Sequence, residues 1–306
     1  MAKVKTFKTI FPAVSVPLND DYSINEPEFR AYLRWIKSFY GKGIEGLVCN
    51  GHTGEITGLT RAERKRVVEI CSEECGDVMT IISGVNCENT AESIAMAKEA
   101  KEAGADGILL MPPHMWLRFG MNPNAPFEYV KDVAEGADID IIIHLYPATS
   151  KAFYPVETLI KMCKEIDHVK CIKMGTRVTS IYEHDVRLLR QECPDISLIT
   201  CHDETLCVSW FPGMDGALIG FAGCVPELIC PAWDVFKNPD KHTLKEAQDW
   251  SNRIYHISQA IYGGGQPSGE AHARLKEALK QRGIFTSALM RKPVLPLNQE
   301  EKDWVA

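Results

Sequence analysis

Val169-Lys170-Cys171-Ile172-Lys173-Met174-Gly175 is the stretch that decides the fold. This short apolar run contains β-branched residues and is followed by a glycine, a pattern typical of a buried parallel strand that ends in a turn. Because side chains alternate along a strand, Val169, Cys171 and Lys173 share one face. Lys170 lies at the mouth of the strand, where its charge reaches water, whereas Lys173 lies at the far end.

Lys173 is therefore the first candidate for chemistry. Burial of an ammonium group lowers its pKa and leaves a neutral amine. Such an amine condenses with a ketone to give a Schiff base. Two structural interpretations stay open: the side chain extends past the strand end into solvent, or it pairs with an acid such as Glu55 or Asp203.

Apolar strand-like runs alternate along the chain with amphipathic helical stretches, which predicts an α/β fold with a parallel sheet. Eight repeats favour a (β/α)8 TIM barrel over an open doubly wound sheet, whose first strand would precede a glycine-rich phosphate turn. The segment after the first run, Pro17-Leu-Asn-Asp-Asp, is not such a turn. The expected strands are Ile10–Pro17, Ile44–Cys49, Met79–Val85, Gly107–Pro112, Ile139–Leu145, Val169–Met174, Ile196–Cys201 and Gly216–Phe221.

Seven helical stretches fall between or after these strands. Thr60 and Glu63 have capping-box spacing, and Thr90 is expected to begin the third helix as its cap. The expected helices are 25/26–38, 60–74, 90–103, 127–134, 155–166, 179–192 and 204–212.

Helices at 226–236, 241–262 and 268–283 exceed what a barrel needs, and the last two are separated by a flexible turn at 263–267. We therefore divide the chain into a catalytic barrel, 1–224, and a C-terminal helical region packed on it, 225–306. This region is a candidate oligomer interface.

Bulk composition excludes several classes of function. The chain has 306 residues and a net charge of −7, which argues against nucleic acid or an anionic membrane as partner. The sequence contains neither a run of 18 apolar residues nor the apolar core of a signal peptide. Eleven cysteines without a CxxC pair predict reduced thiols rather than a zinc site or disulfide framework, and hence a cytoplasmic protein.

Active sites of barrels lie at the carboxyl ends of the strands. After the second strand, Gly51-His52-Thr53-Gly54-Glu55 would expose backbone N–H groups to an anion such as a carboxylate. Alternatively, it is an ordinary turn whose glycines supply positive φ.

Titratable and aromatic side chains follow other strands. His144 and Tyr146 share a face at the end of strand five, where either could move a proton, although a lone histidine is often a core residue. Asp203, after strand seven, is interpreted as the cap of the next helix. Met115 and Trp116, after strand four, are typical of a pocket wall.

The joint arrangement resembles the dihydrodipicolinate synthase / N-acetylneuraminate lyase family, whose members are Schiff-base lysine barrels acting on pyruvate or other 2-oxo acids. The matching segments are Gly51-His52-Thr53-Gly54-Glu55, Gly104-Ala-Asp-Gly-Ile-Leu-Leu-Met-Pro-Pro113, Ile172-Lys173 and Gly216-Ala-Leu-Ile-Gly220.

The resemblance implies a role for each matching position. It identifies Lys173 as the Schiff-base residue and His144 or Tyr146 as the group that moves protons. Neither a metal nor an organic cofactor is implied, since the lysine itself supplies the electrophile. The substrate is expected to contact Gly51, His52, Thr53, Gly54, Trp116, Ile219 and Gly220.

Three positions depart from the family pattern. His144 aligns with the tyrosine of the family's Y-N-x-P segment, and His52 replaces the first hydroxyl residue of its G-T-T-G-E turn. Thr149 matches the arginine with which the synthase holds its second substrate, which argues against dihydrodipicolinate synthase itself. Pro147–Pro155 and Pro113–Trp116 are similar to the branch of hydratase-aldolases that cleave benzylidenepyruvates, although that branch also keeps the tyrosine.

We therefore expect a lyase, either an aldolase or a hydratase-aldolase, that acts on pyruvate or a substituted 2-oxo acid through an imine on Lys173. The alternatives are a dehydratase or deaminase of a hydroxylated 2-oxo acid, dihydrodipicolinate synthase itself, and a non-catalytic 2-oxo-acid-binding protein. Met115, Trp116 and the missing arginine suggest a bulky or aromatic aldehyde partner. Family members imply a homo-oligomer, either a tetramer or a dimer.

Overall fold

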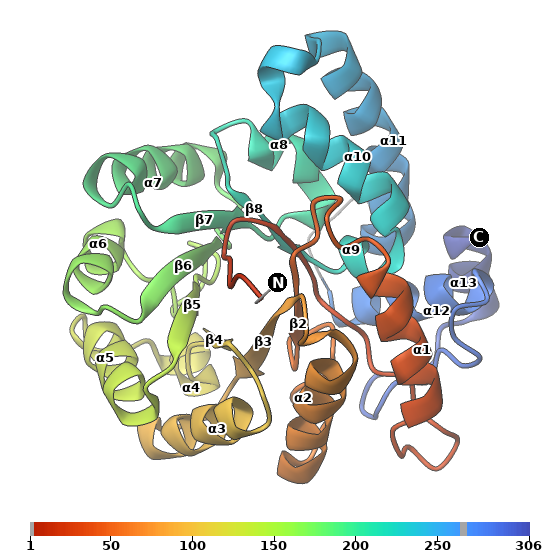
Figure 1. Ribbon diagram of the computed structural model, residues 1–306, viewed down its shortest axis with the longest axis horizontal. Helices are drawn as coiled ribbons and strands as arrows, with labels where there is room; N and C mark the ends of the chain where they lie inside the picture. The colour runs from red at the N-terminus through yellow and green to blue at the C-terminus, as the bar shows by residue number, and fades with distance from the viewer. Residues whose placement is uncertain (1–2, 264–267) are drawn as a thin grey trace.

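Eight parallel strands form a single sheet in the order β1-β8-β7-β6-β5-β4-β3-β2. The computed structural model describes residues 3–263 and 268–306. The two end strands meet through a parallel bridge between Ala13 and Val48, so the sheet curves into a nearly closed barrel with helices outside it (Figure 1). The predicted (β/α)8 TIM barrel is confirmed.

Each expected apolar run contains one strand, but most strands are shorter than the runs. The first run extends to Pro17, whereas β1 ends at Pro12, although residues 13–17 remain buried. An apolar run indicates which residues are buried, and residues remain buried beyond the last hydrogen bond between strands, toward the mouth of the barrel. The strands are β1 (Ile10–Pro12), β2 (Gly46–Cys49), β3 (Thr80–Val85), β4 (Gly107–Leu110), β5 (Asp140–His144), β6 (Val169–Met174), β7 (Ser197–Thr200) and β8 (Gly216–Ile219).

The longer barrel helices were predicted within a few residues of their bounds. The capping box between Thr60 and Glu63 is confirmed at the start of α2. The cap expected at Thr90 is wrong, because the Asn89 side chain accepts from the backbone N–H of Glu92 and Thr90 becomes the first helical residue. These helices are α1 (Glu26–Lys37), α2 (Arg61–Cys75), α3 (Thr90–Glu102), α5 (Ala125–Ala137), α6 (Val156–Glu165), α7 (Thr179–Glu192) and α10 (Pro226–Lys237).

Short helices escaped prediction because one or two turns carry too little periodicity to be recognised. The helix expected at 204–212 is a 3₁₀ turn, η1 (Asp203–Thr205), followed by α8 (Leu206–Trp210). The unexpected short elements are α4 (His114–Phe119), α9 (Phe221–Cys224), η2 (Pro239–Lys241) and α13 (Gln299–Val305).

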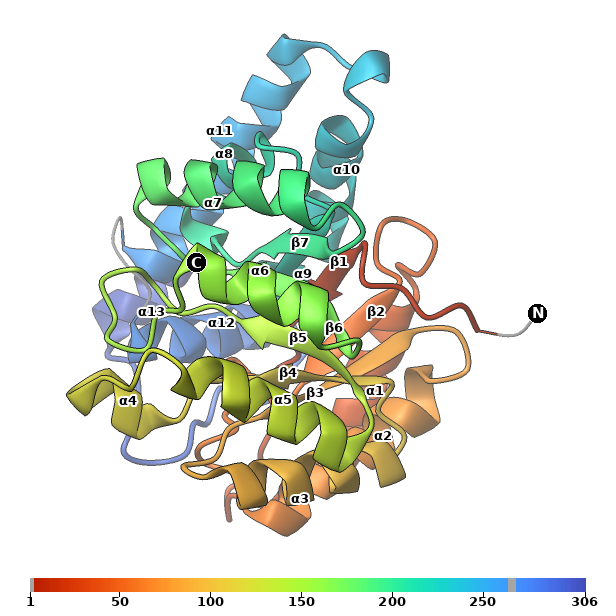
Figure 2. The same ribbon diagram turned by 90° about the vertical axis from the view of Figure 1, so that its left-hand side faces the viewer.

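The predicted C-terminal helical region contains α11 (Leu244–Tyr262) and α12 (Gly269–Gln281). Gly263 ends α11 with a φ of 61°, and the rest of the turn expected at 263–267 lies outside the described residues. Figure 2 shows α4, α12 and α13 at one end of the barrel, opposite the end that carries the N-terminus. The C-terminal region therefore covers part of the barrel end where the strands finish. None of the described helices is long and apolar enough to cross a membrane.

Candidate active site

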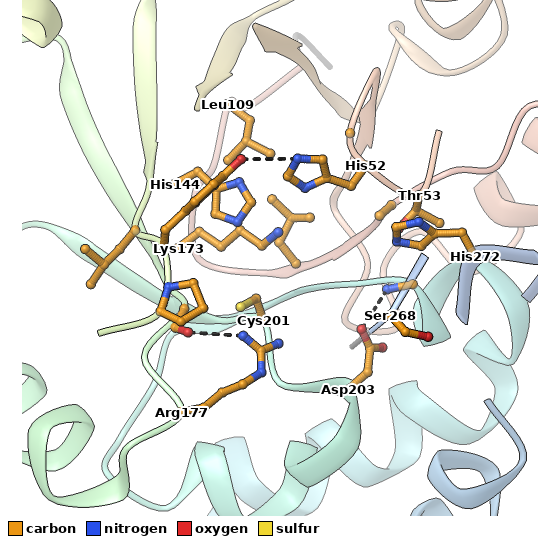
Figure 3. Close-up of a pocket in the computed structure, with 18 of the residues that line it drawn as sticks. His52, Thr53, Leu109, His144, Lys173, Arg177, Cys201, Asp203, Ser268 and His272 are labelled. Carbon is orange, nitrogen blue, oxygen red and sulfur yellow. Dashed lines mark hydrogen bonds between the residues drawn. The ribbon is translucent and has the colours of Figure 1, made fainter. Parts of the chain in front are cut away.

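A cavity of about 390 Å³ opens at the carboxyl ends of the strands (Figure 3). Lys173 lines it from β6, and the β5 partner opposite Lys173 in the sheet register is His144. The structure thus brings together the lysine and the strand-five groups that the sequence singled out. Of the predicted site residues, those that line the cavity are Gly51, His52, Thr53, His144, Tyr146, Lys173 and Gly220.

The Lys173 amine makes no hydrogen bond or ion pair with any described residue. Both acids considered as its partners are engaged elsewhere. Glu55 forms an ion pair with Lys276, and Asp203 accepts hydrogen bonds from other groups. The ion-pair interpretation of Lys173 is therefore wrong, and the exposed Lys170 on the same strand provides a natural contrast.

Burial lowers the pKa of Lys173, and the positive charge of Arg177 lowers it further, while Cys201 and Asp203 oppose this shift. Part of the lysine faces the open cavity, so a ligand can reach it. A larger fraction of neutral amine at a given pH makes the nitrogen a better nucleophile.

Tyr146 and His52 line the same cavity and form a hydrogen-bonded pair, with the Tyr146 hydroxyl oxygen 3.2 Å from Nε2 of His52; a dashed line at His52 marks this bond in Figure 3. Burial lowers the pKa of His52 to about 3, with Lys173 contributing, so the imidazole is neutral near pH 7. Burial raises the pKa of Tyr146, so the phenol keeps its proton near pH 7, and the neutral His52 ring orients that hydroxyl through their hydrogen bond.

His144 occupies the position of the family tyrosine, and its surroundings differ from those of Tyr146. Its ring centroid lies 4.9 Å from that of Tyr146, but its Nδ1 is buried without a hydrogen-bond partner in the described chain. Burial and the nearby Lys173 hold the pKa of His144 well below its usual value. His144 is thus a neutral, uncoupled neighbour of the relay pair.

The turn after β2 is closed by hydrogen bonds from the Ile56 N–H to the Gly51 carbonyl and from the Glu55 N–H to the His52 carbonyl. Positive φ occurs at Asn50 (52°) and Glu55, not at the glycines, so the interpretation of these glycines as sources of positive φ is wrong. Gly54 is required for close approach, because an added Cβ would lie 3.0 Å from the Val14 carbonyl oxygen. Within the described chain the backbone N–H groups of His52 and Thr53 have no partner, as a site for a carboxylate requires.

Three residues expected to contact substrate do not line the cavity: Gly54, Trp116 and Ile219. The short helix α4 turns Trp116 onto Tyr129 and Tyr154, with ring centroids 5.7 and 6.2 Å away. Leu218 and Gly220 line the cavity, so strand alternation places the intervening Ile219 on the other face of β8.

Asp203 does not cap the helix that follows it, contrary to expectation. Its carboxylate accepts from the backbone N–H groups of Gly220 and Phe221 and from the Tyr262 hydroxyl. These contacts join η1, the start of α9 and α11 at the cavity wall. Burial raises the pKa of Asp203 to about 6 despite the hydrogen bonds, which favour the charged form.

Sequence reasoning also missed several cavity residues. Arg177 follows β6, donates from Nη1 to the Gly175 carbonyl over 3.1 Å and forms an ion pair with Glu204. Its position in the loop after strand six, at the carboxyl end of a barrel strand, could have identified Arg177 as a cavity residue. Tyr262, Ser268 and His272 had no such signal, because they come from the C-terminal helical region and not from strand ends. Among the described residues, no three metal-ligating side chains are arranged to hold an ion.

Comparisons with known proteins agree with this geometry. The model of the "Dihydrodipicolinate synthetase family" matches residues 6–306. An uncharacterized DapA-like lyase of Pyrococcus horikoshii is 29% identical over 292 residues, covering 95% of each chain. A 4-hydroxy-tetrahydrodipicolinate synthase of Bartonella bacilliformis is 26% identical over 298 residues, covering 97% of this chain and 95% of the relative.

Solved structures share the fold at lower identity. A prophage protein of E. coli K12 from the dihydrodipicolinic acid synthase family, solved in complex with pyruvate, superimposes with a TM-score of 0.87 at 20% identity, covering 98% of this chain and 97% of that one. The N-acetylneuraminate lyase of Fusobacterium nucleatum gives a TM-score of 0.82 at 21% identity, covering 97% and 96%. Both are similar to this chain over nearly its whole length.

Proposed function

This chain belongs to the dihydrodipicolinate synthetase family, whose members are Schiff-base class I aldolase-type lyases acting on pyruvate, and we propose that Lys173 is its imine-forming residue. The observation that carries the proposal is a half-buried amine that lines the cavity at the end of β6 and has no hydrogen-bond or ion-pair partner among the described residues. The exposed amine of Lys170 on the same strand lacks this environment.

The reaction begins when the neutral amine of Lys173 attacks the ketone of a 2-oxo acid. Loss of water gives a protonated imine, which withdraws electrons from the C2–C3 region of the substrate. Carbanion character at C3 then permits retro-aldol cleavage, aldol addition or loss of a β-hydroxyl group. The free N–H groups of His52 and Thr53, with the Thr53 hydroxyl, hold the substrate carboxylate.

Tyr146 moves the protons, with His52 as its partner. Their hydrogen bond supports this assignment over His144, which lacks a corresponding contact. The hydrogen bond to His52 holds the Tyr146 hydroxyl in place, and the hydroxyl passes a proton between two atoms of the bound substrate, taking one as it gives up its own.

The aldehyde portion of the substrate is the least constrained part of the proposal. Met115 and Trp116, which suggested a bulky aromatic group, do not line the cavity, but Leu109, Leu117 and Pro147 do. An apolar wall therefore remains, and we retain an aldolase or hydratase-aldolase acting on an apolar aldehyde portion. Steady-state kinetics on benzylidenepyruvates and on sugar-derived 2-oxo acids test this, and faster turnover of the polyhydroxylated substrates contradicts it.

A dehydratase or deaminase acting on a hydroxylated 2-oxo acid is the second candidate. Arg177 and Asp203 on the cavity wall favour it, because they could bind substrate hydroxyl groups. Release of water or ammonia without an aldehyde would identify this reaction.

Borohydride trapping tests the central assignment. Reduction in the presence of pyruvate, followed by intact mass and peptide mapping, should place one pyruvate-sized adduct on Lys173. The adduct should disappear in Lys173→Ala and persist in the matched control Lys170→Ala. An unmodified wild-type protein would refute the imine mechanism, and an adduct without turnover of any 2-oxo acid would identify a binding protein.

We also propose that the protein is a cytoplasmic homo-oligomer. All eleven cysteines are free thiols, which suits a reducing compartment. Val208 and Phe211 expose 58% and 62% of their surface on neighbouring turns at the end of α8, as a contact between copies requires. We also propose the division of the chain into a barrel, 1–224, and a C-terminal helical region, 225–306. The two regions act together, because residues of α12 in the C-terminal region line the cavity of the barrel.

A further inference from the structure

His272 on α12 brings an imidazole into the cavity from outside the barrel strands. In the view of Figure 3, His272 lies beyond the amine end of Lys173, on the side of Thr53. We propose that His272 is a substrate-binding residue that donates a hydrogen bond to the carboxylate of the 2-oxo acid. The proposal rests on the proposed function, since it assumes that the substrate is held at Lys173.

The first support is the way α12 is attached to the turn after β2. Lys276 is 1% exposed and forms an ion pair with Glu55, the last residue of that turn. Its Nζ also donates to the Leu289 carbonyl over 2.8 Å, and the Arg291 backbone N–H donates to the second Glu55 oxygen over 2.9 Å. A buried ion pair with additional hydrogen bonds has little freedom to shift, so α12 is fixed relative to the turn.

The second support is the direction in which His272 faces. It precedes Lys276 by four residues and Leu275 by three, so all three lie on the same face of the helix. Leu275 packs so closely over Gly220 that an added Cβ there would lie 2.6 Å from its Cδ1 and 3.7 Å from Thr53 Oγ1. The helix face that carries His272 therefore meets the edge of the turn at Thr53.

The third support is chemical. Burial, with a contribution from Lys173, lowers the pKa of His272 to about 4, so the imidazole is neutral near pH 7 and offers one N–H donor. A carboxylate accepts about four hydrogen bonds, more than the two N–H groups of His52 and Thr53 can supply. The N–H group of His272 would supply one of the remaining hydrogen bonds that the carboxylate can accept.

The experiment measures the pyruvate concentration that gives half-maximal borohydride trapping at Lys173. We compare wild type with His272→Leu, His272→Asn and His272→Gln, and use the exposed His184→Leu as matched control. A lost hydrogen bond to a charged group raises this concentration about ten- to hundredfold in the leucine variant. Asparagine or glutamine, depending on which ring nitrogen donates, should restore it to within about threefold, because a side-chain amide also donates.

Three results overturn the proposal. A leucine variant that traps pyruvate like wild type shows that no contact exists, and equal weakening by leucine, asparagine and glutamine assigns His272 a packing role. Unchanged half-saturation with a reduced kcat in every variant makes His272 an acid–base group instead. In each of these cases the wild-type adduct on Lys173 persists and the proposed function stands. Absence of that adduct would refute both the proposed function and the role of His272.

Discussion

At the residue scale, the reactive end of the cavity combines one unpaired amine with several neutral rings. Each of His52, His144 and His272 has a lowered pKa, with burial as the main cause and Lys173 as a contributor. Keeping these imidazoles uncharged avoids a cluster of cations around the amine. It also leaves each ring with one hydrogen-bond donor and one acceptor at neutral pH.

The relay assignment predicts different effects for the two strand-five residues. Tyr146→Phe removes the hydroxyl that pairs with His52, so kcat should fall by about 10²–10⁴-fold, the usual contribution of a general acid–base group, with little change in KM. His144→Phe should reduce kcat less, because no described residue bonds to its Nδ1. Steady-state kinetics check both, and the opposite ranking would transfer the relay to His144.

The raised pKa of Asp203 predicts that the stability of the protein depends on pH. Its pKa is raised from 3.8 to about 6 in the folded protein, so the folded state holds its proton more tightly than the unfolded chain. Stability from this group is present below pH 4 and is lost as the pH rises through 6, by roughly 3 kcal/mol. Urea denaturation of wild type and Asp203→Asn between pH 4 and 7 measures this, and the variant should lack that loss. Parallel curves for the two proteins would contradict it.

Residues on strands were predictable because barrel chemistry collects at strand ends, and alternation indicates which side chains face the cavity. That reasoning placed Lys173 and Tyr146 at the cavity, and both line it. It placed Trp116 wrongly, since the six-residue helix α4 after β4 turns the indole away, and so short a helix has no periodic signal. It also interpreted Asp203 as a local cap, whereas its partners lie at the start of α9 and on α11.

At the element scale, α12 is the helix whose placement most affects the cavity. Its sequence predicts an amphipathic helix, but the pattern does not indicate which surface receives its buried face. The contact depends on Lys276, which would be read from sequence alone as a solvent-exposed residue. Burial lowers its pKa, and the charge of Glu55 opposes this effect. Long-range ion pairs of this kind are not encoded in local spacing, so the C-terminal contribution to the cavity could not be predicted.

The Lys276–Glu55 pair predicts a specific pattern of stability. Lys276→Met leaves Glu55 charged and buried, which should lower the free energy of unfolding by about 3–5 kcal/mol. The double variant Glu55→Gln, Lys276→Met buries no unpaired charge and should be more stable than Lys276→Met alone. Urea midpoints of the three proteins provide the comparison. A double variant less stable than the single one would show that the pair acts through its hydrogen bonds and not through charge.

At the scale of the whole molecule, the barrel class followed from counting alternating strands and helices, because each βαβ unit imposes the same burial pattern. Contacts between subunits were harder to predict from the sequence, since exposed apolar residues are common on the surface of any protein. Val208 and Phe211 differ from isolated exposed residues because they line one hollow together, beside Arg187 and Glu183 of α7. A mixed apolar and charged face of this kind is typical of contacts between subunits.

This face leads to the prediction about assembly. Phe211 is 62% exposed and stacks edge-on against Phe236, so an aspartate there would place a charge in any contact made by α8 without disturbing the barrel core. Wild type should sediment at a mass above the 34.2 kDa of one chain, and Phe211→Asp should shift toward smaller species. Val4→Asp changes an apolar position before β1 that is 78% exposed; it is the matched control and should assemble like wild type. If wild type sediments as a single chain, or if Phe211→Asp assembles as wild type does, the proposed contact through α8 does not exist.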